Sequence, residues 1–332
     1  MKAFVIDRFG GPLHAAEMPT PQLGPGDVLV EVHAASLNPV DYKIRDGKLK
    51  AVIPYRLPLI LGNDLSGVVA AVGADVRQVR VSDEVYARAD KDRIGSLAEF
   101  IAVREDSVAP KPASLSMEEA AAVPLVALTA LQAFERAGLK AGQKVLIHAG
   151  SGGVGTVAIQ LAKHRGAYVA TTTSTGNVDW VRALGADRVI DYKTEDFATE
   201  LRDYDMVFDT LGGATTEASL AVLKPGGMLV SVSGPPDPAF AREWKLGWVK
   251  EQVMRLLSMR IRAAAKRHGV KYSFLFMSPS GAQLRELGSL IDAGVLRPVV
   301  DRSFPFRESA EALAYLETGR AKGKVVVSLR DG

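Results

Sequence analysis

The chain has 332 residues, of which 47% are hydrophobic and 24% are charged, a composition typical of a globular protein with room for two domains. Its 41 basic and 38 acidic residues are mixed along the chain, and the net charge of +3 argues neither for a nucleic acid nor for a membrane as partner. The sequence has no cysteine, which excludes disulfides, thiolate nucleophiles and zinc sites with thiolate ligands. No stretch reaches the roughly 18 apolar residues of a membrane span, and the N-terminus lacks a signal-peptide pattern, so we expect a cytoplasmic protein.

Residues 1 to about 115 consist of short β-rich runs between Gly and Pro turns, which predicts a small all-β unit. The expected strands are Lys2–Ile6, Asp27–Ala35, Gly67–Val72, Asp83–Ala87 and Ser96–Val103. Ser116 and Glu119 form a capping-box pattern that begins a helix running to about Ala137. We expect this helix to link two domains.

From Gln143 on, apolar runs alternate with helical stretches, which predicts a parallel sheet covered by helices on both faces. The runs are KVLIHAG, AYVATTT, RVID, MVFD and GGMLVSVSG, with helices over 154–165 and 177–184. Near Pro235 this alternation stops. The tail is expected to hold a strand at Tyr272–Met277, helices around Leu284–Ile291 and 308–318, and a last strand KVVVSL.

Residues 239–271 are predicted to be helical and are strongly basic, with 9 Lys and Arg against 2 Glu. We favour the interpretation that this segment is the solvated face of a helix packed on its own domain through apolar positions. These positions are Trp244, Trp248, Val253, Leu256 and Leu257. The alternative is a surface for an anionic partner.

Gly150, Gly152 and Gly155 form a G-x-G-x-x-G motif between an apolar strand and an apolar-faced helix. The first glycine permits a tight turn, the second lets the backbone approach a pyrophosphate, and the third allows close packing of strand and helix. In this context the motif predicts a dinucleotide site. Residues 170–176 carry Thr and Ser hydroxyls but no carboxylate for a ribose 2′-OH, which favours NADPH. Strand propensity explains the threonines but not the missing acid.

Eight motifs follow one another in an order that resembles a known family. They are SLNPVDYKIRDG (36–47), LGNDLSGVVAAVG (61–73), GSLAEF (95–100), AAVPLVALTALQAF (121–134), AGSGGVGTVAIQLAK (149–163), LGADRVIDY (184–192), FDTLGG (208–213) and GRAKGKVVVSL (319–329). With them the whole chain resembles the zinc-independent medium-chain dehydrogenase/reductases, in the group of quinone oxidoreductases and enone reductases. The resemblance implies an α/β chain with a GroES-like catalytic domain over 1–120, a Rossmann NADP-binding domain over 121–265 and a return to the first domain over 266–332, with the active cleft between them.

The positions of zinc ligands in related enzymes carry other residues in this chain. Zinc alcohol dehydrogenases of the superfamily have a Cys at the position of Asn38 and Gly-His-Glu where this chain has Gly62, Asn63 and Asp64. Because amide and carboxylate oxygens do not reproduce such a site, we expect no metal. Without a Lewis acid, the oxidation of simple alcohols is disfavoured and the reduction of an already polarised acceptor remains.

The resemblance implies an NADPH-dependent reductase that passes hydride to a quinone or to the β-carbon of an α,β-unsaturated carbonyl, while the protein stabilises the developing oxyanion. Its candidate catalytic residues are Asn38, Asp41, Tyr42 and Lys43. Lys43 would donate a hydrogen bond or a proton to the oxyanion, or hold the nicotinamide ribose, and Asp41 would orient Lys43. On the residues alone, the segment is a turn with a solvated Lys43.

The other site positions are carried over from the same resemblance. Candidates for cofactor binding are Thr129, Gly150, Ser151, Gly152, Gly153, Val154, Gly155, Ser174, Asn177, Tyr192, Leu211, Gly234, Phe276 and Lys324, and candidates for the acceptor pocket are Tyr55, Phe274 and Met277. Ordinary packing or solvation explains each of them as well. Many relatives have a Lys two residues after Ser174 for the 2′-phosphate, where this chain has Gly176.

Two further functions stay open: reduction of simple aldehydes or ketones, and a catalytically weak NADPH-binding scaffold that uses the basic 239–271 segment to hold a partner. We also expect a homodimer, because relatives pair through the edge strands of their Rossmann sheets, here assigned to Met228–Ser233.

Overall fold

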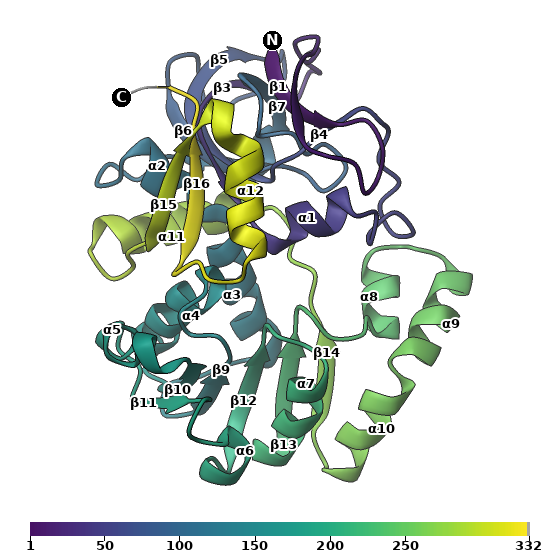
Figure 1. The fold of residues 1–332 in the computed structure, drawn as a ribbon, viewed down its shortest axis with the longest axis vertical. Coiled ribbons are helices and arrows are strands. Elements are labelled where there is room, and N and C mark those ends of the chain that lie inside the picture. Colours follow the sequence, from purple (N-terminus) through teal and green to yellow (C-terminus); the bar gives the residue numbers. More distant parts are fainter. Residues whose placement is uncertain (331–332) are drawn as a thin grey trace. The chain divides into compact units, whose positions relative to one another are not determined.

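The computed structural model describes residues 1–330 and divides the chain into two compact units (Figure 1). The first unit contains Met1–Leu128 and the residues from Ser278 on, and the second contains Thr129–Met277. These divisions lie later in the chain than the predicted boundaries at 120/121 and 265/266. Residues 121–128 belong with the first unit, and the strand that begins at Lys271 pairs within the sheet of the second.

The first unit is built on a seven-stranded sheet in the order β15-β16-β3-β5-β6-β8, with β7 also paired to β3, and on a three-stranded sheet β2-β1-β4. Its strands are β1 (Lys2–Ile6), β2 (His14–Glu17), β3 (Asp27–Leu37), β4 (Leu59–Ile60), β5 (Asp64–Val72), β6 (Glu84–Arg88), β7 (Phe100–Arg104), β8 (Val108–Pro110), β15 (Val300–Pro305) and β16 (Lys324–Ser328). Its helices are α1 (Pro39–Arg45), α2 (Met117–Ala121), α11 (Gly281–Asp292) and α12 (Ser309–Glu317), with short turns η1 (Glu105–Ser107) and η4 (Phe306–Glu308).

The last strand completes the sheet of the first unit, as predicted. β16 pairs antiparallel with β3 on one side and parallel with β15 on the other. Val325, Val326 and Val327 are all fully buried. A strand covered on both faces has no solvent side, which explains why its sequence is a continuous apolar run rather than an alternating one.

The predicted linking helix is two helices. Ser116 caps α2 as expected, since its side chain accepts from the Glu119 N–H at 3.2 Å and the Glu119 carboxylate accepts from the Ser116 N–H at 2.9 Å. α2 ends at Ala121, and α3 (Pro124–Ala137) begins at Pro124. Proline has no N–H to donate and fits the first position of a helix, so it starts a new helix instead of continuing the old one.

The second unit has a six-stranded sheet in the order β11-β10-β9-β12-β13-β14, and every neighbouring pair is parallel. Its strands are β9 (Lys144–Ile147), β10 (Tyr168–Thr173), β11 (Arg188–Asp191), β12 (Tyr204–Asp209), β13 (Leu223–Ser231) and β14 (Lys271–Phe274). Its helices after α3 are α4 (Gly153–His164), α5 (Val178–Ala183), α6 (Phe197–Glu200), α7 (Ala214–Ser219), α8 (Pro238–Glu243), α9 (Trp248–Leu257) and α10 (Met259–Arg267), with turns η2 (Thr175–Asn177) and η3 (Leu220–Val222). This strand order confirms the predicted Rossmann fold.

The expected edge strand of this unit is wrong. Met228–Ser233 does not form an edge strand, because β13 has β12 on one side and β14 on the other. The sheet instead ends at β11 and β14. The edge was misassigned because three helices separate β13 from β14, so the last strand looked like part of the tail.

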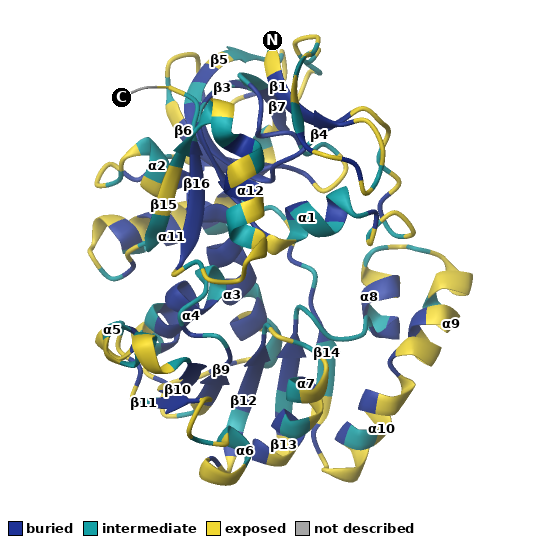
Figure 2. Cartoon of the chain, in the orientation of Figure 1, coloured by how far each residue is buried: buried dark blue, intermediate teal, exposed yellow. Residues whose placement is uncertain are grey.

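The basic 239–271 segment forms α8, α9 and α10, which pack on their own unit as favoured, but through other apolar residues than most of those expected: Met254, Ile261 and Ala265 are buried. Trp248 is 75% exposed and Leu256 is 68% exposed, whereas Met254 is the buried residue of α9. Figure 2 shows α9 as mostly exposed. Only Trp244 of the expected apolar positions packs inward, against Phe240 and Phe276. Within residues 1–330, no helix is long and apolar enough to cross a bilayer.

His148, which follows β9, makes the stability of the second unit depend on pH. The ring is fully buried and hydrogen-bonds Thr172 Oγ1 at 3.2 Å and Ser219 Oγ at 2.8 Å. Burial lowers the pKa of His148 to about 4. An unfolded histidine has a pKa near 6.5, so between about pH 6.5 and 4 the unfolded chain binds a proton that the folded chain does not. Stability therefore falls as the pH falls through this range.

We predict that this group alone lowers the free energy of unfolding by about 2 kcal/mol between pH 7 and pH 5. His148→Gln keeps a donor and an acceptor but cannot titrate, so its stability should fall less over the same range. Urea unfolding at pH 5, 6 and 7 measures the difference. Parallel pH dependences of the two proteins would contradict the prediction.

Candidate active site

The candidate catalytic segment begins where β3 ends and forms the start of a helix. Asn38 is the N-cap of α1, and Pro39 occupies its first position. Asp41, the third residue of the helix, accepts a hydrogen bond from the Asn38 N–H at 2.7 Å. This is the reciprocal half of a capping box, which satisfies a donor that the helix itself leaves free. Asn38 and Asp41 are both buried, so the segment is not the solvated turn that its residues alone suggested.

The Asn38 side chain lies between a buried cation and a buried anion. Its Oδ1 accepts a hydrogen bond from Lys324 Nζ at 2.6 Å, and its Nδ2 donates to Asp64 Oδ2 at 2.8 Å. Lys324 Nζ also donates to the Leu37 carbonyl at 2.9 Å and lies 3.5 Å from Asp64 Oδ2. The positions that carry Cys and Glu in zinc enzymes are thus joined here by hydrogen bonds and an ion pair.

Asp41 has different partners from the one proposed. Asp41 Oδ1 accepts from Asn63 Nδ2 at 2.7 Å, while Oδ2 accepts from the Asn38 N–H. Both oxygens therefore face buried donors, and no contact with Lys43 is found among the described residues. The expectation that Asp41 orients Lys43 directly is wrong; Asp41 instead fixes the start of the helix that carries Lys43.

Four buried ionisable groups balance one another in this part of the first unit: Asp41, Asp64, Lys324 and Arg88. Arg88 lies opposite Asp64 in the ladder between β5 and β6. Burial raises the pKa of Asp41 to about 6 and raises the pKa of Asp64, while it lowers the pKa of Lys324 and of Arg88. Two acids and two bases leave the cluster close to neutral, which is the arrangement that a low-dielectric interior tolerates.

Tyr42 and Lys43 follow Asp41 on α1 and are half-buried. Burial lowers the pKa of Lys43, and the nearby Lys48 lowers it further. A lysine whose charge is disfavoured gives up a proton more readily than a solvated one. Burial also raises the pKa of Tyr42.

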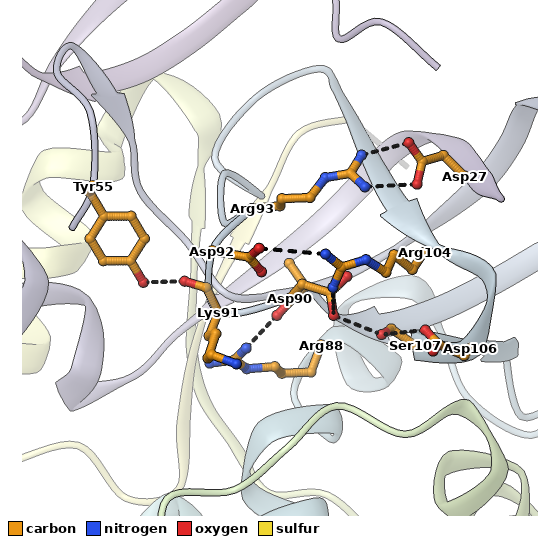
Figure 3. Close-up of polar contacts among 11 residues, drawn as sticks. Asp27, Tyr55, Arg88, Asp90, Lys91, Asp92, Arg93, Arg104, Asp106 and Ser107 are labelled. Atoms are coloured by element: carbon orange, nitrogen blue, oxygen red, sulfur yellow. Dashed lines mark hydrogen bonds and ion pairs between the residues drawn. The ribbon is translucent and has the colours of Figure 1, made fainter. Parts of the chain in front are cut away.

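Tyr55, a candidate for the acceptor pocket, is tied to the loop that follows β6 (Figure 3). Its hydroxyl donates to the Lys91 carbonyl at 2.5 Å. The same loop is held by Arg93, which donates two hydrogen bonds of 2.7 Å to Asp27. Arg104 lies 3.1 Å from Asp90 and adds a second ion pair. The loop is therefore held at Asp90 and Arg93, and the hydroxyl of Tyr55 bonds to it between these residues.

The glycine-rich loop of the second unit has the contacts that a dinucleotide site needs. A Cβ on Gly150 would lie 2.3 Å from Thr171 Oγ1, and one on Gly155 would lie 2.2 Å from the Ala149 carbonyl oxygen. The chain therefore requires glycine at both positions for close packing. The tight turn itself falls on Ala149, which has a φ of 54°, and not on Gly150 as expected.

Gly152 differs from its two neighbours in the motif. A Cβ there would meet only the Ala149 carbonyl oxygen, at 3.4 Å. Gly152 is the N-cap of α4, whose first N–H groups have no acceptor within the helix. Space beside these donors suits a pyrophosphate, so Gly152, Gly153 and Val154 fit the predicted cofactor contacts. Ser151, between Gly150 and Gly152, is half-buried in the same loop.

The other cofactor candidates of this unit follow the carboxyl ends of the parallel strands. Ser174 follows β10, Tyr192 follows β11, Leu211 follows β12, Gly234 follows β13 and Phe276 follows β14. Ligands of open parallel sheets bind outside this end, near the point where the strand order reverses, here between β9 and β12. These candidates thus all lie at the carboxyl end of the strands of a single sheet.

Local contacts fix several of these candidates. Asn177 Nδ2 donates to Ser174 Oγ at 3.1 Å, and the Tyr192 N–H donates to the Thr173 carbonyl at 3.1 Å, so the ends of β10 and β11 lie together. Tyr192 and Leu211 are each more than half exposed. A Cβ on Gly234 would lie 2.5 Å from Tyr272 Oη.

The remaining candidates are more deeply packed. Phe276 lies in an aromatic cluster with Phe240 and Trp244. Phe274 and Met277 are buried, with Phe274 edge-on to Phe240. Thr129, on α3, is also buried.

Sequence reasoning missed three residues. Asn63 and Arg88 are fully buried polar residues in the cluster of the first unit, and Asn63 Oδ1 and Arg88 Nε have no hydrogen-bond partner within residues 1–330. Lys193 follows Tyr192 and holds its Nζ 5.1 Å from the centre of that ring. A cation next to the tyrosine of the IDY run was visible in the sequence. The other two residues had no signal, because nothing in a single sequence marks a polar residue as buried.

We predict that alanine at the third and at the second motif glycine impairs NADPH binding in both cases but lowers stability only at the third. Gly155→Ala should lower the free energy of unfolding by about 1–3 kcal/mol and abolish NADPH binding, because its Cβ overlaps the Ala149 carbonyl oxygen. Gly152→Ala should keep the stability of the wild type but weaken NADPH binding, because its Cβ enters the space beside the helix N-terminus. Thermal unfolding and titration of NADPH fluorescence test both variants. Wild-type affinity in Gly152→Ala would show that the pyrophosphate does not bind there.

Comparison with known proteins agrees with this fold and arrangement. The model of the alcohol dehydrogenase GroES-like domain matches residues 24–113, and a model described as zinc-binding dehydrogenase matches residues 184–327. The structure is similar to the quinone oxidoreductase of Coxiella burnetii, with a TM-score of 0.85 and 37% identity over 99% of both chains.

Two curated relatives cover the chain equally well. A mitochondrial NAD(P)H oxidoreductase of Danio rerio is 36% identical over 100% of this chain and 92% of its own length. A chloroplastic NADPH-dependent alkenal/one oxidoreductase of Arabidopsis thaliana is 36% identical over 98% of this chain and 79% of its own length. Since relatives of this identity span the whole chain, it belongs to the quinone and enone oxidoreductase group of the medium-chain dehydrogenase/reductases.

Proposed function

We propose that this chain is an NADPH-dependent reductase that transfers hydride, without zinc, to a quinone or to the β-carbon of an α,β-unsaturated carbonyl. The observation that carries the proposal is the glycine-rich loop at the reversal point of a parallel sheet, in a chain whose relatives include a quinone oxidoreductase and an alkenal/one oxidoreductase. The zinc-free part is supported by Asn38 and Asp64, whose polar atoms are engaged with each other and with Lys324.

NADPH, when bound, supplies the hydride. In our proposal the main chain at Gly152, Gly153 and Val154 holds its pyrophosphate. Ser174 and Tyr192 bind the 2′-phosphate, and Lys193 provides the cation that relatives place two residues after Ser174. An ammonium beside a phosphate favours the phosphorylated ribose over the bare hydroxyl of NADH.

Lys43 is the group that we assign to the acceptor. An oxyanion that develops on the carbonyl or quinone oxygen is stabilised by a hydrogen bond from the Lys43 ammonium, which is half-buried on α1. Its lowered pKa favours passing the proton on as the product forms. In our proposal Phe274, Phe276 and Met277 of the second unit form an apolar surface for a flat conjugated acceptor, and Tyr55 of the first unit stays a candidate for contact with the same acceptor.

The assembly and location of the chain are also proposals. We propose a homodimer formed by pairing of β14, one of the two edge strands of the sheet of the second unit, with its copy. Light scattering should give twice the chain mass of 35.4 kDa, and the mass of one chain at micromolar concentration would contradict the dimer. The cytoplasm stays a prediction, since relatives carry mitochondrial and chloroplastic names.

An acceptor panel tests the function. Consumption of NADPH, followed in metal-free buffer at 340 nm, should occur with a quinone, an enone or an enal and not with a saturated aldehyde. Turnover of the saturated aldehyde alone would favour the simple carbonyl reductase, and NADPH binding without any turnover would favour the scaffold.

We predict that Lys43→Ala lowers kcat with a conjugated acceptor on the order of 100-fold and leaves the Kd of NADPH within about threefold. The reason is that Lys43 acts on the oxyanion, which exists only during reduction. Lys50→Ala removes an exposed lysine a few residues further on and should behave as wild type. Equal kcat in the Lys43 variant and the wild type would remove Lys43 from the mechanism.

A further inference from the structure

One buried ion pair joins three segments of the first unit that are far apart in the sequence. Lys324 is the first residue of β16, Asp64 is the first residue of β5, and both contact Asn38 at the start of α1. We propose that Asp64 and Lys324 are positioning residues, which orient the Asn38 side chain and hold the N-termini of α1 and α3 in place for reduction. The inference rests on the proposed function, because the positioned groups are those of the proposed reductase site.

Lys324 fixes the point at which β3 turns into α1. Its Nζ donates both to the Leu37 carbonyl, at the end of β3, and to Oδ1 of the next residue, Asn38. These contacts span 287 and 286 positions of the sequence. The main chain and the side chain at the turn are thus held by one buried ammonium. Lys43 lies on the helix that starts there.

Asp64 connects the same turn to α3. Asp64 Oδ2 accepts from Asn38 Nδ2 and, at 3.2 Å, from Ser36 Oγ. Asp64 Oδ1 accepts from the Leu125 N–H at 2.8 Å. Leu125 is the second residue of α3, and Pro124 before it has no N–H, so this is the first donor that the helix offers. Thr129, the proposed nicotinamide contact, follows four residues later, one turn further along the same helix.

The pair leaves the Asn38 amide only one orientation. The Lys324 ammonium faces the amide oxygen, and the Asp64 carboxylate faces the amide NH₂ group. If the amide were flipped, its NH₂ group would face the ammonium and its oxygen would face the carboxylate, and both contacts would be repulsive. The side chains of Lys324 and Asp64 are 4% and 0% exposed, so water does not replace either contact. Loss of either partner therefore frees the amide and leaves a buried charge without its counterpart.

Two roles for this pair make different predictions. If it only stabilises the fold, turnover should follow stability. If it positions the site, turnover should depend on the contacts with Asn38 even when stability is restored. The double variant Asp64→Asn/Lys324→Met separates the two roles. It removes both charges, so no buried charge is left without its counterpart, but the contacts of Lys324 with Asn38 and Leu37 are still lost.

We expect Lys324→Met to lower both the thermal unfolding midpoint and kcat, the latter on the order of 100-fold, as small displacements of catalytic groups do. The double variant should recover most of the midpoint but keep the low kcat. The Kd of NADPH should stay within about threefold of wild type in both. As a control, Lys163→Met/Asp187→Asn makes the same exchanges at an ion pair of 2.8 Å in the second unit and should keep wild-type kcat.

Hydrogen exchange gives a readout that needs no turnover. In the double variant without ligands, amides of 36–46 and 123–130 should exchange faster than in the wild type, while those of 149–165 should not change. Recovery of kcat together with the midpoint, or unchanged exchange in both segments, would overturn the inference. A large loss of NADPH affinity in Lys324→Met would overturn it too, in favour of direct cofactor binding by Lys324.

These outcomes are separable from a failure of the proposed function. A wild type that reduces none of the acceptors would refute the reductase, whereas the exchange measurement would still decide whether Asp64 and Lys324 hold the two helix N-termini.

Discussion

A buried lysine ammonium needs oxygen atoms of the protein as hydrogen-bond acceptors, because water does not reach it. In the first unit the acceptors of Lys324 come from three separate segments, which this requirement holds together. The three neighbours of Lys324 are a main-chain carbonyl, an amide oxygen and a carboxylate, supplied by β3, the N-cap of α1 and β5. The carboxylate then has capacity left for the first donor of α3. A metal ion would gather ligands from separate segments in the same way. Here a cation that is part of the chain does so, and the atoms gathered around it are oxygens.

The second unit meets a different requirement, that of presenting main-chain donors to an anion. The carboxyl ends of its parallel strands lie on the same side of the sheet. In the loop after β9, Gly150 packs so closely on Thr171, and Gly155 on the Ala149 carbonyl, that neither position has space for a side chain. At Gly152, in contrast, an added Cβ would meet one atom, the Ala149 carbonyl oxygen, at 3.4 Å. The Asp209 carboxylate fixes the loop that follows β12. It accepts hydrogen bonds from the Leu211 and Gly212 N–H groups at 3.0 Å and from Ser231 Oγ at 2.7 Å. The candidates after β12 and β13 therefore share one buried carboxylate.

Local patterns predicted much of this molecule, and contacts between distant segments account for the rest. The capping box at Ser116, the glycine motif and the alternating strands and helices are each contained in fewer than about 20 residues, so the sequence displays them directly. Lys324 in a short apolar strand looked like a cofactor contact or a solvated residue, because no local signal indicates a partner 286 positions away. The edge of the sheet was misplaced for a related reason. β14 pairs with β13 across three intervening helices, and strand pairing over such an insertion has no sequence pattern.

The order in which the two units occur along the chain bears on how the protein is made. The second unit is one continuous stretch, whereas the first needs residues from both sides of it. During synthesis the second unit can fold as soon as it leaves the ribosome, while the β-strands before it wait for β15 and β16. Until then Asp64 lacks the ammonium that it faces in the folded chain. Arrival of the last strand supplies this cation and joins the start of β5 to the start of α1 in the same event.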